Sequence, residues 1–156
     1  MDDSGRIVSR THPQYEDYDV SEFVSVRDYG AKGDGVTDDT EALKAIFAQA
    51  CKIFLFVQKT KLKLGHRQFA GCKIIFLDAG HYIVTSTVTI PAGTRLVGEA
   101  WSVLAGSGPA FQDQDNPQVI FKVGEEGSQG IIEITDVVFS TVGPGKFDIF
   151  YHDYGN

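Results

Sequence analysis

The sequence predicts a mostly β protein folded as a parallel β-helix, in which short strands stack in successive turns of the chain. From residue 71 onward, short apolar runs alternate with turn residues and show no helical period. Ile74, Leu96 and Val119 lie in such runs at nearly equal intervals along the chain, as expected for a repeating coil. The connections lack the Asn-Gly turns that typify an antiparallel meander, which favours a β-helix over a sandwich.

Composition narrows the class of partner. The chain has 156 residues, of which 42% are hydrophobic and 22% charged, and a formal net charge of −7. These proportions are typical of a globular domain. A strongly acidic chain does not suit phosphate-rich nucleic acid or an anionic membrane, so a neutral, polyhydroxylated partner is expected instead. No apolar run approaches the roughly 20 residues that span a bilayer.

Residues 1–22 are acidic and polar, without a hydrophobic period, and we interpret them as a linker or arm that packs on a neighbouring domain. The start, Met1 to Gly5, lacks the positive and apolar regions of a secretory signal. We therefore expect either an intracellular protein or one whose true N-terminus lies upstream.

Residues 23–50 read as a strand, a tight loop and a helix, and we name residues 28–39 the opening loop. Gly30, Gly33 and Gly35 fall close together, a density that indicates tight turns with positive φ. Asp38 is placed to cap the helix, and Glu41, three positions later, to complete a capping box. The helical face expected to be buried comprises Leu43, Ile46, Phe47 and Ala50.

Residues 51–70 form an irregular segment. An apolar run over 53–57 precedes a basic cluster of Lys59, Lys61, Lys63, His66 and Arg67. A strand with a solvated basic tail, or an insertion, is favoured over an anion-binding patch. Cys51-Lys52-Ile53 is repeated as Cys72-Lys73-Ile74, which indicates either one coil of a repeating structure or a chance match. The two cysteines either form a disulfide, which would stabilise the fold by about 3 kcal/mol, or are separate buried thiols.

Residues 71–145 hold the predicted strands, each ended by glycine, proline or aspartate. We expect strands at 73–77, 81–84, 87–90, 95–98, 119–123, 131–134 and 137–139, with a long excursion between 101 and 118. Residues 146–156 lose this pattern and form a divergent tail.

Two sets of segments carry a family resemblance. Residues 28–40, Asp-Tyr-Gly-Ala-Lys-Gly-Asp-Gly-Val-Thr-Asp-Asp-Thr, closely resemble the opening motif of pectate-lyase-like right-handed β-helix proteins, and 78–84, 90–94 and 96–98 resemble their first rungs. More narrowly, residues 97–103 and 134–144 are similar to the second β-helix of fungal family 55 glycoside hydrolases, the exo-β-1,3-glucanases.

The resemblance implies a secreted, fungal, carbohydrate-active parent that hydrolyses β-1,3-glucan with inversion and packs two β-helices side by side. It implies that the opening loop and helix cap the solenoid. It also places the catalytic carboxylates further along the second β-helix, past Asn156, so we expect a truncated and inactive chain with no catalytic residue of its own.

Among the carboxylates of the strand region, Glu99, Glu133 and Asp136 are the candidates for sugar chemistry. Glu99 and Trp101 are predicted to contact a sugar, the indole by stacking, although a polar rim and a packed indole are the commoner arrangement. Glu133 and Asp136 are three positions apart and would face opposite sides of an extended strand. Asp136 is better interpreted as a turn residue that binds backbone amides.

The residue patterns expected of nucleotide-binding, metal-binding and lyase sites do not occur in this sequence. The glycines of the opening loop match neither the dinucleotide nor the phosphate-loop spacing, so no cofactor is predicted. Asp34, Asp38 and Asp39 lack the spacing of a calcium loop, and the four histidines are scattered, so no metal is predicted. Arg95 alone does not supply the calcium-and-base constellation of a lyase.

The sequence thus favours a glucan 1,3-β-glucosidase-like β-helix with a polysaccharide, β-1,3-glucan, as partner. Two alternatives stay open: a non-catalytic polysaccharide-binding or capping module, and a pectin-degrading lyase or hydrolase of the same superfamily. Because the last rung has no neighbour to cover it, we also expect low solubility.

Overall fold

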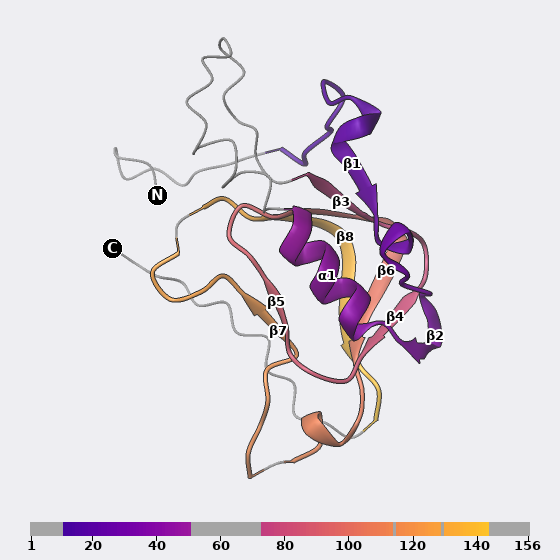
Figure 1. Cartoon of the computed structure of the whole chain (residues 1–156), viewed down its shortest axis with the longest axis vertical. Coiled ribbons are helices and arrows are strands. Elements are labelled where there is room, and N and C mark those ends of the chain that lie inside the picture. Colours follow the sequence, from indigo (N-terminus) through magenta and orange to yellow (C-terminus); the bar gives the residue numbers. More distant parts are fainter. Residues whose placement is uncertain (1–10, 51–72, 114, 129, 144–156) are drawn as a thin grey trace.

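Successive turns of this chain bring apolar side chains to matching positions, and the strands therefore stack in parallel. The computed structural model describes residues 11–50, 73–113, 115–128 and 130–143 (Figure 1). We number the turns of the coil as rungs in chain order. Rung 1 contains β1 (Phe23–Ser25) and β2 (Asp34–Asp38), and rung 2 contains β3 (Ile74–Leu77), β4 (His81–Val84) and β5 (Val88–Ile90). Rung 3 contains β6 (Arg95–Gly106) and β7 (Phe121–Val123), and rung 4 contains β8 (Glu133–Thr141).

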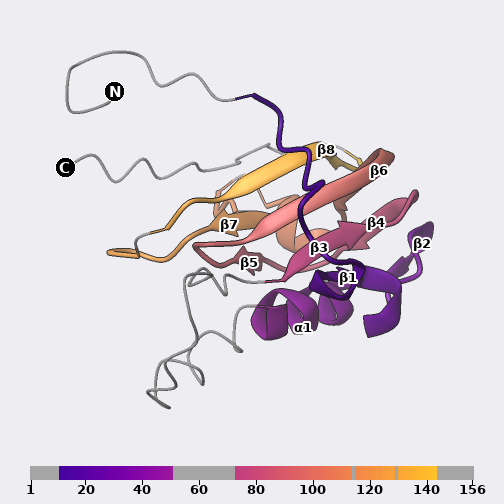
Figure 2. The same ribbon diagram turned by 90° about the horizontal axis from the view of Figure 1, so that it is seen from above.

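The strands form three parallel stacks. In the first, β1 pairs with β3, β3 with the start of β6, and that segment with the start of β8. In the second, β2 pairs with β4, β4 with the end of β6, and that segment with the end of β8. The third stack pairs β5 with β7. Figure 2 shows the rungs edge-on, layered from β1 and β2 up to β8. This is a parallel β-helix-like architecture, in agreement with the sequence prediction.

The interior is a column of apolar residues, one from each rung. Val24, Ile75, Leu96 and Ile134 align by register in the first stack, and Ile75 and Leu96 are fully buried. Removing such side chains from water is the main driving force for stacking. At the far end of the column, the Phe139 ring packs edge-on against Phe121, with 5.3 Å between centroids.

Helix α1 (Thr40–Ala50) takes the place of a third strand in rung 1. It packs against β3, β5 and the 3₁₀ turn η2 (Val26–Tyr29), and it lies at the opposite end of the stack from β8 (Figure 2). Its buried residues are the predicted Leu43, Ile46, Phe47 and Ala50, together with Thr40. Two further 3₁₀ turns are η1 (Val20–Glu22) and η3 (Pro109–Phe111).

Some strand predictions were wrong. The opening loop contains β2, which periodicity missed because every residue of that strand is exposed. The predicted excursion after residue 101 begins as a strand, since β6 continues to Gly106 by pairing with β4. The two strands expected over 131–139 are the single strand β8.

The expectation of nearly equal rung intervals was also wrong beyond Leu96. Ile75 pairs with Leu96 in the first stack, but Leu96 pairs with Ile134, which lies much further along the chain. The segment near Val119 belongs to the third stack, where Phe121 pairs with Val88. Rung 3 is longer because η3 and its flanking loops are inserted before β7.

Several predictions fall on residues that lie outside the described ranges. These concern the basic cluster, Cys51 and Cys72, the insertion at 51–70 and the tail at 146–156. Within the described ranges, no helix is long and apolar enough to cross a membrane.

Candidate functional site

The first and second stacks meet at a turn that we name the corner, formed by residues 78–80, 98–102 and Asp136. In rung 3 the register shifts between Val97 and Ser102, so the corner protrudes there. Ala100 and Trp101 both have a positive φ, 51° and 61°, which L-residues with side chains rarely adopt. The chain tolerates this because the turn is anchored on both sides.

The anchor is Ser102, whose side chain is buried. Its Oγ lies 2.9 Å from the carbonyl oxygen of Leu77, 3.0 Å from that of Asp78 and 2.7 Å from that of Glu99. On the other side, a Cβ at Gly98 would lie 2.1 Å from the carbonyl oxygen of Asp136, so only glycine fits there. These contacts fix the direction in which residues 99–101 project.

Trp101 projects into solvent from this turn, with 69% of its surface exposed. Glu99, two positions earlier in the same turn, is also exposed, and its Oε2 accepts a hydrogen bond of 3.1 Å from the backbone amide of Ala79. The structure therefore brings the two predicted sugar-contact residues to one protruding corner. An exposed indole can stack on a sugar ring, and an exposed carboxylate held by a backbone amide can accept hydrogen bonds from sugar hydroxyls.

The other two candidate carboxylates already have partners. Glu133 Oε2 forms an ion pair with Arg95 Nε at 3.3 Å and accepts a hydrogen bond from the Tyr15 hydroxyl at 3.1 Å. Asp136 Oδ2 lies 3.1 Å from Nε2 of His12. Asp136 has a φ of 56°, so β8 is not extended there, and the same N-terminal segment contacts both carboxylates.

The opening loop is organised around Asp39, which is 2% exposed. Its two carboxylate oxygens accept hydrogen bonds from the backbone amides of Lys32 at 2.7 Å and Gly33 at 3.0 Å. Its carbonyl oxygen accepts the first helical hydrogen bond, from Leu43 N. Asp39 therefore stands at the helix boundary, one position after the predicted cap.

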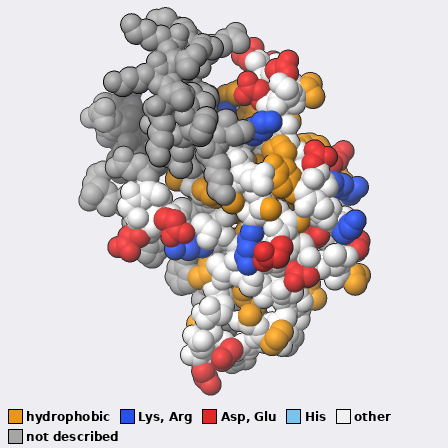
Figure 3. Space-filling model, viewed as in Figure 1, with side chains coloured by type: hydrophobic (Ala, Val, Ile, Leu, Met, Phe, Trp, Pro, Cys, Tyr) orange, Lys and Arg blue, Asp and Glu red, His pale blue; other side chains and the backbone are white. Residues whose placement is uncertain are grey.

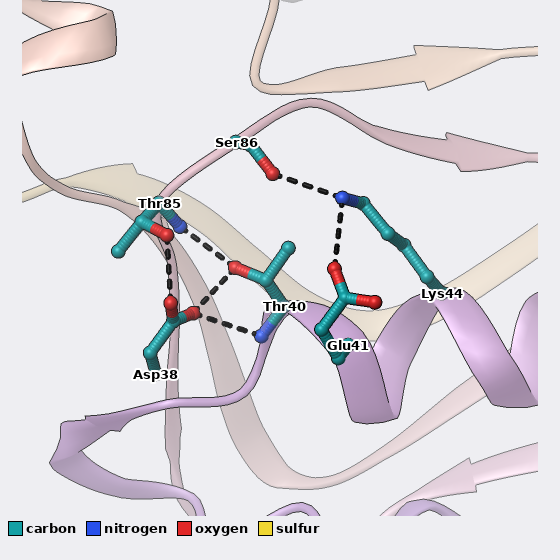
Figure 4. Close-up of polar contacts among 6 residues, drawn as sticks. All are labelled: Asp38, Thr40, Glu41, Lys44, Thr85 and Ser86. Atoms are coloured by element: carbon teal, nitrogen blue, oxygen red, sulfur yellow. Dashed lines mark hydrogen bonds and ion pairs between the residues drawn. The ribbon is translucent and has the colours of Figure 1, made fainter.

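Asp38 nevertheless contacts the first residue of the helix, as Figure 4 shows. Its Oδ1 accepts hydrogen bonds from the Thr40 amide at 3.0 Å and from the Thr40 hydroxyl, and its Oδ2 from the Thr85 hydroxyl at 2.7 Å. Burial by itself would raise the pKa of Asp38, but the hydrogen bonds from Thr40 and Thr85 outweigh it and lower that pKa. The network ties α1 to the turn that follows β4.

Glu41 does not close a capping box. Its carboxylate instead pairs with Lys44 Nζ at 3.1 Å, and the same ammonium donates to Ser86 Oγ at 2.9 Å (Figure 4). The backbone amide of Asp39 is already used by the carbonyl oxygen of Ile83, at 2.8 Å. The box fails because the helix begins at Thr40, which moves Glu41 to the second helical position.

All three predicted turn glycines have a positive φ: 91° at Gly30, 61° at Gly33 and 77° at Gly35. Gly33 also packs on Tyr82, whose Cζ atom would lie 2.7 Å from an added Cβ. The Tyr82 hydroxyl donates to the carbonyl oxygen of Asp78, so the opening loop is braced against the corner of rung 2.

The described parts of the chain hold no group of three or more His, Cys, Asp or Glu side chains that could bind a metal. Figure 3 shows acidic, basic and apolar side chains interspersed over the face seen in Figure 1. Sequence reasoning missed the structural role of Asp39 and the reach of His12 and Tyr15. The two adjacent aspartates before the helix were a signal for the role of Asp39. The contacts of His12 and Tyr15 left no local signal, because their partners lie far away in the chain.

Comparisons with known proteins agree with this architecture. Residues 23–149 match the family model described as rhamnogalacturonase A/epimerase, pectate lyase-like. A protein of Cochliobolus carbonum named glucan 1,3-beta-glucosidase is 39% identical over 151 residues, which cover 96% of this chain and 17% of that protein. A probable glucan endo-1,3-beta-glucosidase of Arthroderma benhamiae is 34% identical over 143 residues, covering 92% and 14%.

A protein of Penicillium expansum named a non-secreted LysM effector is 36% identical over 138 residues, covering 88% of this chain and 10% of that protein. The chain thus spans between a tenth and a fifth of the length of these three relatives. The glucanase-named relatives make its resemblance to β-1,3-glucanases explicit. From the fold and the family match together, the chain belongs to the rhamnogalacturonase A/epimerase, pectate lyase-like family.

Proposed function

We propose that this chain is a β-helix unit of a carbohydrate-active protein that acts on β-1,3-glucan, and that its own role is to bind the polysaccharide rather than to cleave it. The observation that carries the proposal is the 39% identity over 96% of the chain to a protein named glucan 1,3-beta-glucosidase. The acidic net charge of −7 also suits a neutral glucan better than an acidic pectin.

The proposed contact residues are Trp101 and Glu99. The indole stacks on a sugar ring, and the free oxygen of the Glu99 carboxylate accepts a hydrogen bond from a sugar hydroxyl while the other holds the Ala79 amide. The anchored turn gives the indole a fixed direction, which lowers the entropic cost of binding.

Hydrolysis is not part of the proposed role of this chain. An inverting glycosidase needs one carboxyl to protonate the leaving oxygen and another to activate water, roughly 6.5–9.5 Å apart. Glu133 is committed to Arg95 and Tyr15, and Asp136 to His12. We expect the parent protein to be extracellular and to place its catalytic pair on other rungs, with a second β-helix packed alongside.

We further propose that α1 and the opening loop, with Gly30, Gly33, Gly35, Asp38 and Glu41, cap a right-handed coil. The packing of α1 on β3 and β5 supports this, because a helix in place of a strand leaves no strand edge above β5.

The single tryptophan offers a direct binding test, since fluorescence excited at wavelengths that tyrosine does not absorb reports Trp101 alone. Titration of the chain with β-1,3-gluco-oligosaccharides should give a saturable change in emission, and titration with oligogalacturonide should give none. Calorimetry should show the binding weakened about tenfold or more by Trp101→Ala and less by Glu99→Gln, and unchanged by Tyr29→Phe as a control.

Two outcomes would count against the proposal. A change on titration with oligogalacturonide alone would favour the pectin alternative, to which the family description points. Glucose release from laminarin by the chain would contradict the non-hydrolytic role.

A further inference from the structure

An N-terminal segment crosses the outside of the first stack. We name residues 12–18 the strap. Figure 2 shows the indigo chain before β1 running from the level of β8, past β6, to β1. The strap therefore runs across the rungs rather than along them, unlike every other connection described above.

The strap contacts rung 4 through two polar side chains. His12 Nε2 lies 3.1 Å from Asp136 Oδ2. The Tyr15 hydroxyl donates to Glu133 Oε2 at 3.1 Å. Burial, and next the negative charge of Glu133, raise the pKa of Tyr15, so this phenol stays a neutral donor throughout the ordinary pH range.

The strap contacts rung 3 through Tyr18. Its ring lies under the Arg95 guanidinium, with 5.2 Å between Cζ and the ring centroid. The same guanidinium pairs with Glu133 at 3.3 Å. A cation–π contact and an ion pair thus share one arginine, which orders both tyrosines relative to β6 and β8.

The strap is joined to rung 1 by aromatic packing. Tyr15 packs edge-on against Phe23 with 6.4 Å between centroids, and against Tyr18 with 5.6 Å. A turn closed by Tyr18 N donating to Tyr15 O at 3.1 Å holds the two rings together. Tyr15 adopts a φ of 53°, a costly conformation for a tyrosine that its surrounding contacts hold in place.

In a solenoid each rung ordinarily contacts only its neighbours, so the outermost rung opens first. The strap departs from that rule, since Tyr15 contacts rung 1 and rung 4 at once. We infer that the strap is a conformational latch that couples rung 1 directly to rung 4, and that its release frees β8 without disturbing rung 2. This inference is independent of the proposed function.

The latch can be tested by amide hydrogen exchange on the full chain. Tyr15→Phe removes the hydroxyl without changing the ring, and Tyr18→Leu removes the cation–π contact. Each should speed exchange of the β8 amides by roughly threefold to tenfold, the effect of losing about one net hydrogen bond. Exchange in β3 and β4 should not change. Tyr29→Phe, which removes a comparable hydroxyl bonded to Gln49 at 3.1 Å, is the matched control and should leave β8 unchanged.

If the strap stabilises β8, then β8 must stabilise the strap by the same free energy, and this gives a second measurement. Glu133→Gln should speed exchange at the Tyr18 amide within the strap, and the double variant Tyr15→Phe/Glu133→Gln should affect β8 little more than the larger single variant. Unchanged β8 exchange in Tyr15→Phe and Tyr18→Leu, equal acceleration in β3 and β4, or additive effects in the double variant would each overturn the latch.

Discussion

Gly33 and Gly30 lie close together in the opening loop and both have a positive φ, yet their surroundings differ. Nothing lies within 4 Å of a Cβ added at Gly30, whereas a Cβ at Gly33 would lie 2.7 Å from the Tyr82 ring. Tyr82 is fully buried and its hydroxyl is bonded to Asp78, so the ring cannot easily move. Glycine is thus required at position 33 both by the positive φ and by the close approach of the Tyr82 ring, and at position 30 by the positive φ alone.

We predict that Gly33→Ala destabilises the protein more than Gly30→Ala. An alanine with positive φ costs about 1–2 kcal/mol at either position. Overpacking against Tyr82 adds roughly 1–3 kcal/mol at Gly33. Urea unfolding monitored by circular dichroism measures both variants. Equal losses would mean that the ring shifts freely.

At the scale of elements, β2 and the start of α1 are held by aspartates rather than by apolar packing. Asp34 Oδ1 accepts hydrogen bonds from the amides of Val36 and Thr37, at 2.9 and 2.7 Å. The hydrogen bonds from Thr37 and Val36 lower the pKa of Asp34 to about 2. The pKa of Asp38 is lowered as well. Because every residue of β2 is exposed, the strand is held by its pairing with β4 and by these carboxylates.

A depressed pKa in the folded state stabilises the protein above the unfolded pKa of about 4, and this stabilisation is lost as pH falls toward 2. We therefore expect the urea midpoint to fall between about pH 5 and 2.5, and to fall less steeply in Asp34→Asn, with the two proteins converging near pH 2. Asp28→Asn is the control, because it removes an exposed carboxylate of the same loop that does not bind the Val36 and Thr37 amides. Identical slopes in all three proteins would show that Asp34 does not couple folding to protons.

How far each element was predictable depends on where its stabilising contacts lie. The buried face of α1 follows from its own helical period, so Leu43, Ile46 and Phe47 were predicted correctly. The second half of β6 was missed because its strand character comes from pairing with β4, as in His81 with Val103. At the site, Glu99 and Trp101 stay predictions as sugar contacts, and the structure adds that they share one corner.

At the scale of the whole molecule, the two ends of the stack differ. At the rung 1 end α1 packs against β5, and the edge strands β1 and β2 are short. At the other end β8 is the outermost strand among the described residues, and Ile131, Val138 and Val142 in or next to it are exposed. Exposed apolar side chains along an outermost strand favour edge-to-edge association.

Val138→Lys should therefore reduce self-association and change the free energy of unfolding by no more than about 0.5 kcal/mol. Val20→Lys is the matched control, because it changes the net charge equally at an exposed valine of η1. Sedimentation velocity over a concentration series should show Val138→Lys alone shifting toward monomer. A wild-type chain that is already monodisperse would refute the association, and equal shifts in both variants would assign the effect to charge.

The sequence by itself determined what local patterns encode. The period of α1, the glycine-rich opening loop and the alternation of short strands with turns are properties of neighbouring residues, and they sufficed for the β-helix prediction and the superfamily resemblance. Only the tertiary structure decided which strands share a stack and why Leu96 pairs with a residue as distant in the chain as Ile134. It also decided which side chains contact Glu133 and Asp136. The physical reason is that register and side-chain pairing are set by packing between segments far apart in the chain, where the local pattern carries no information.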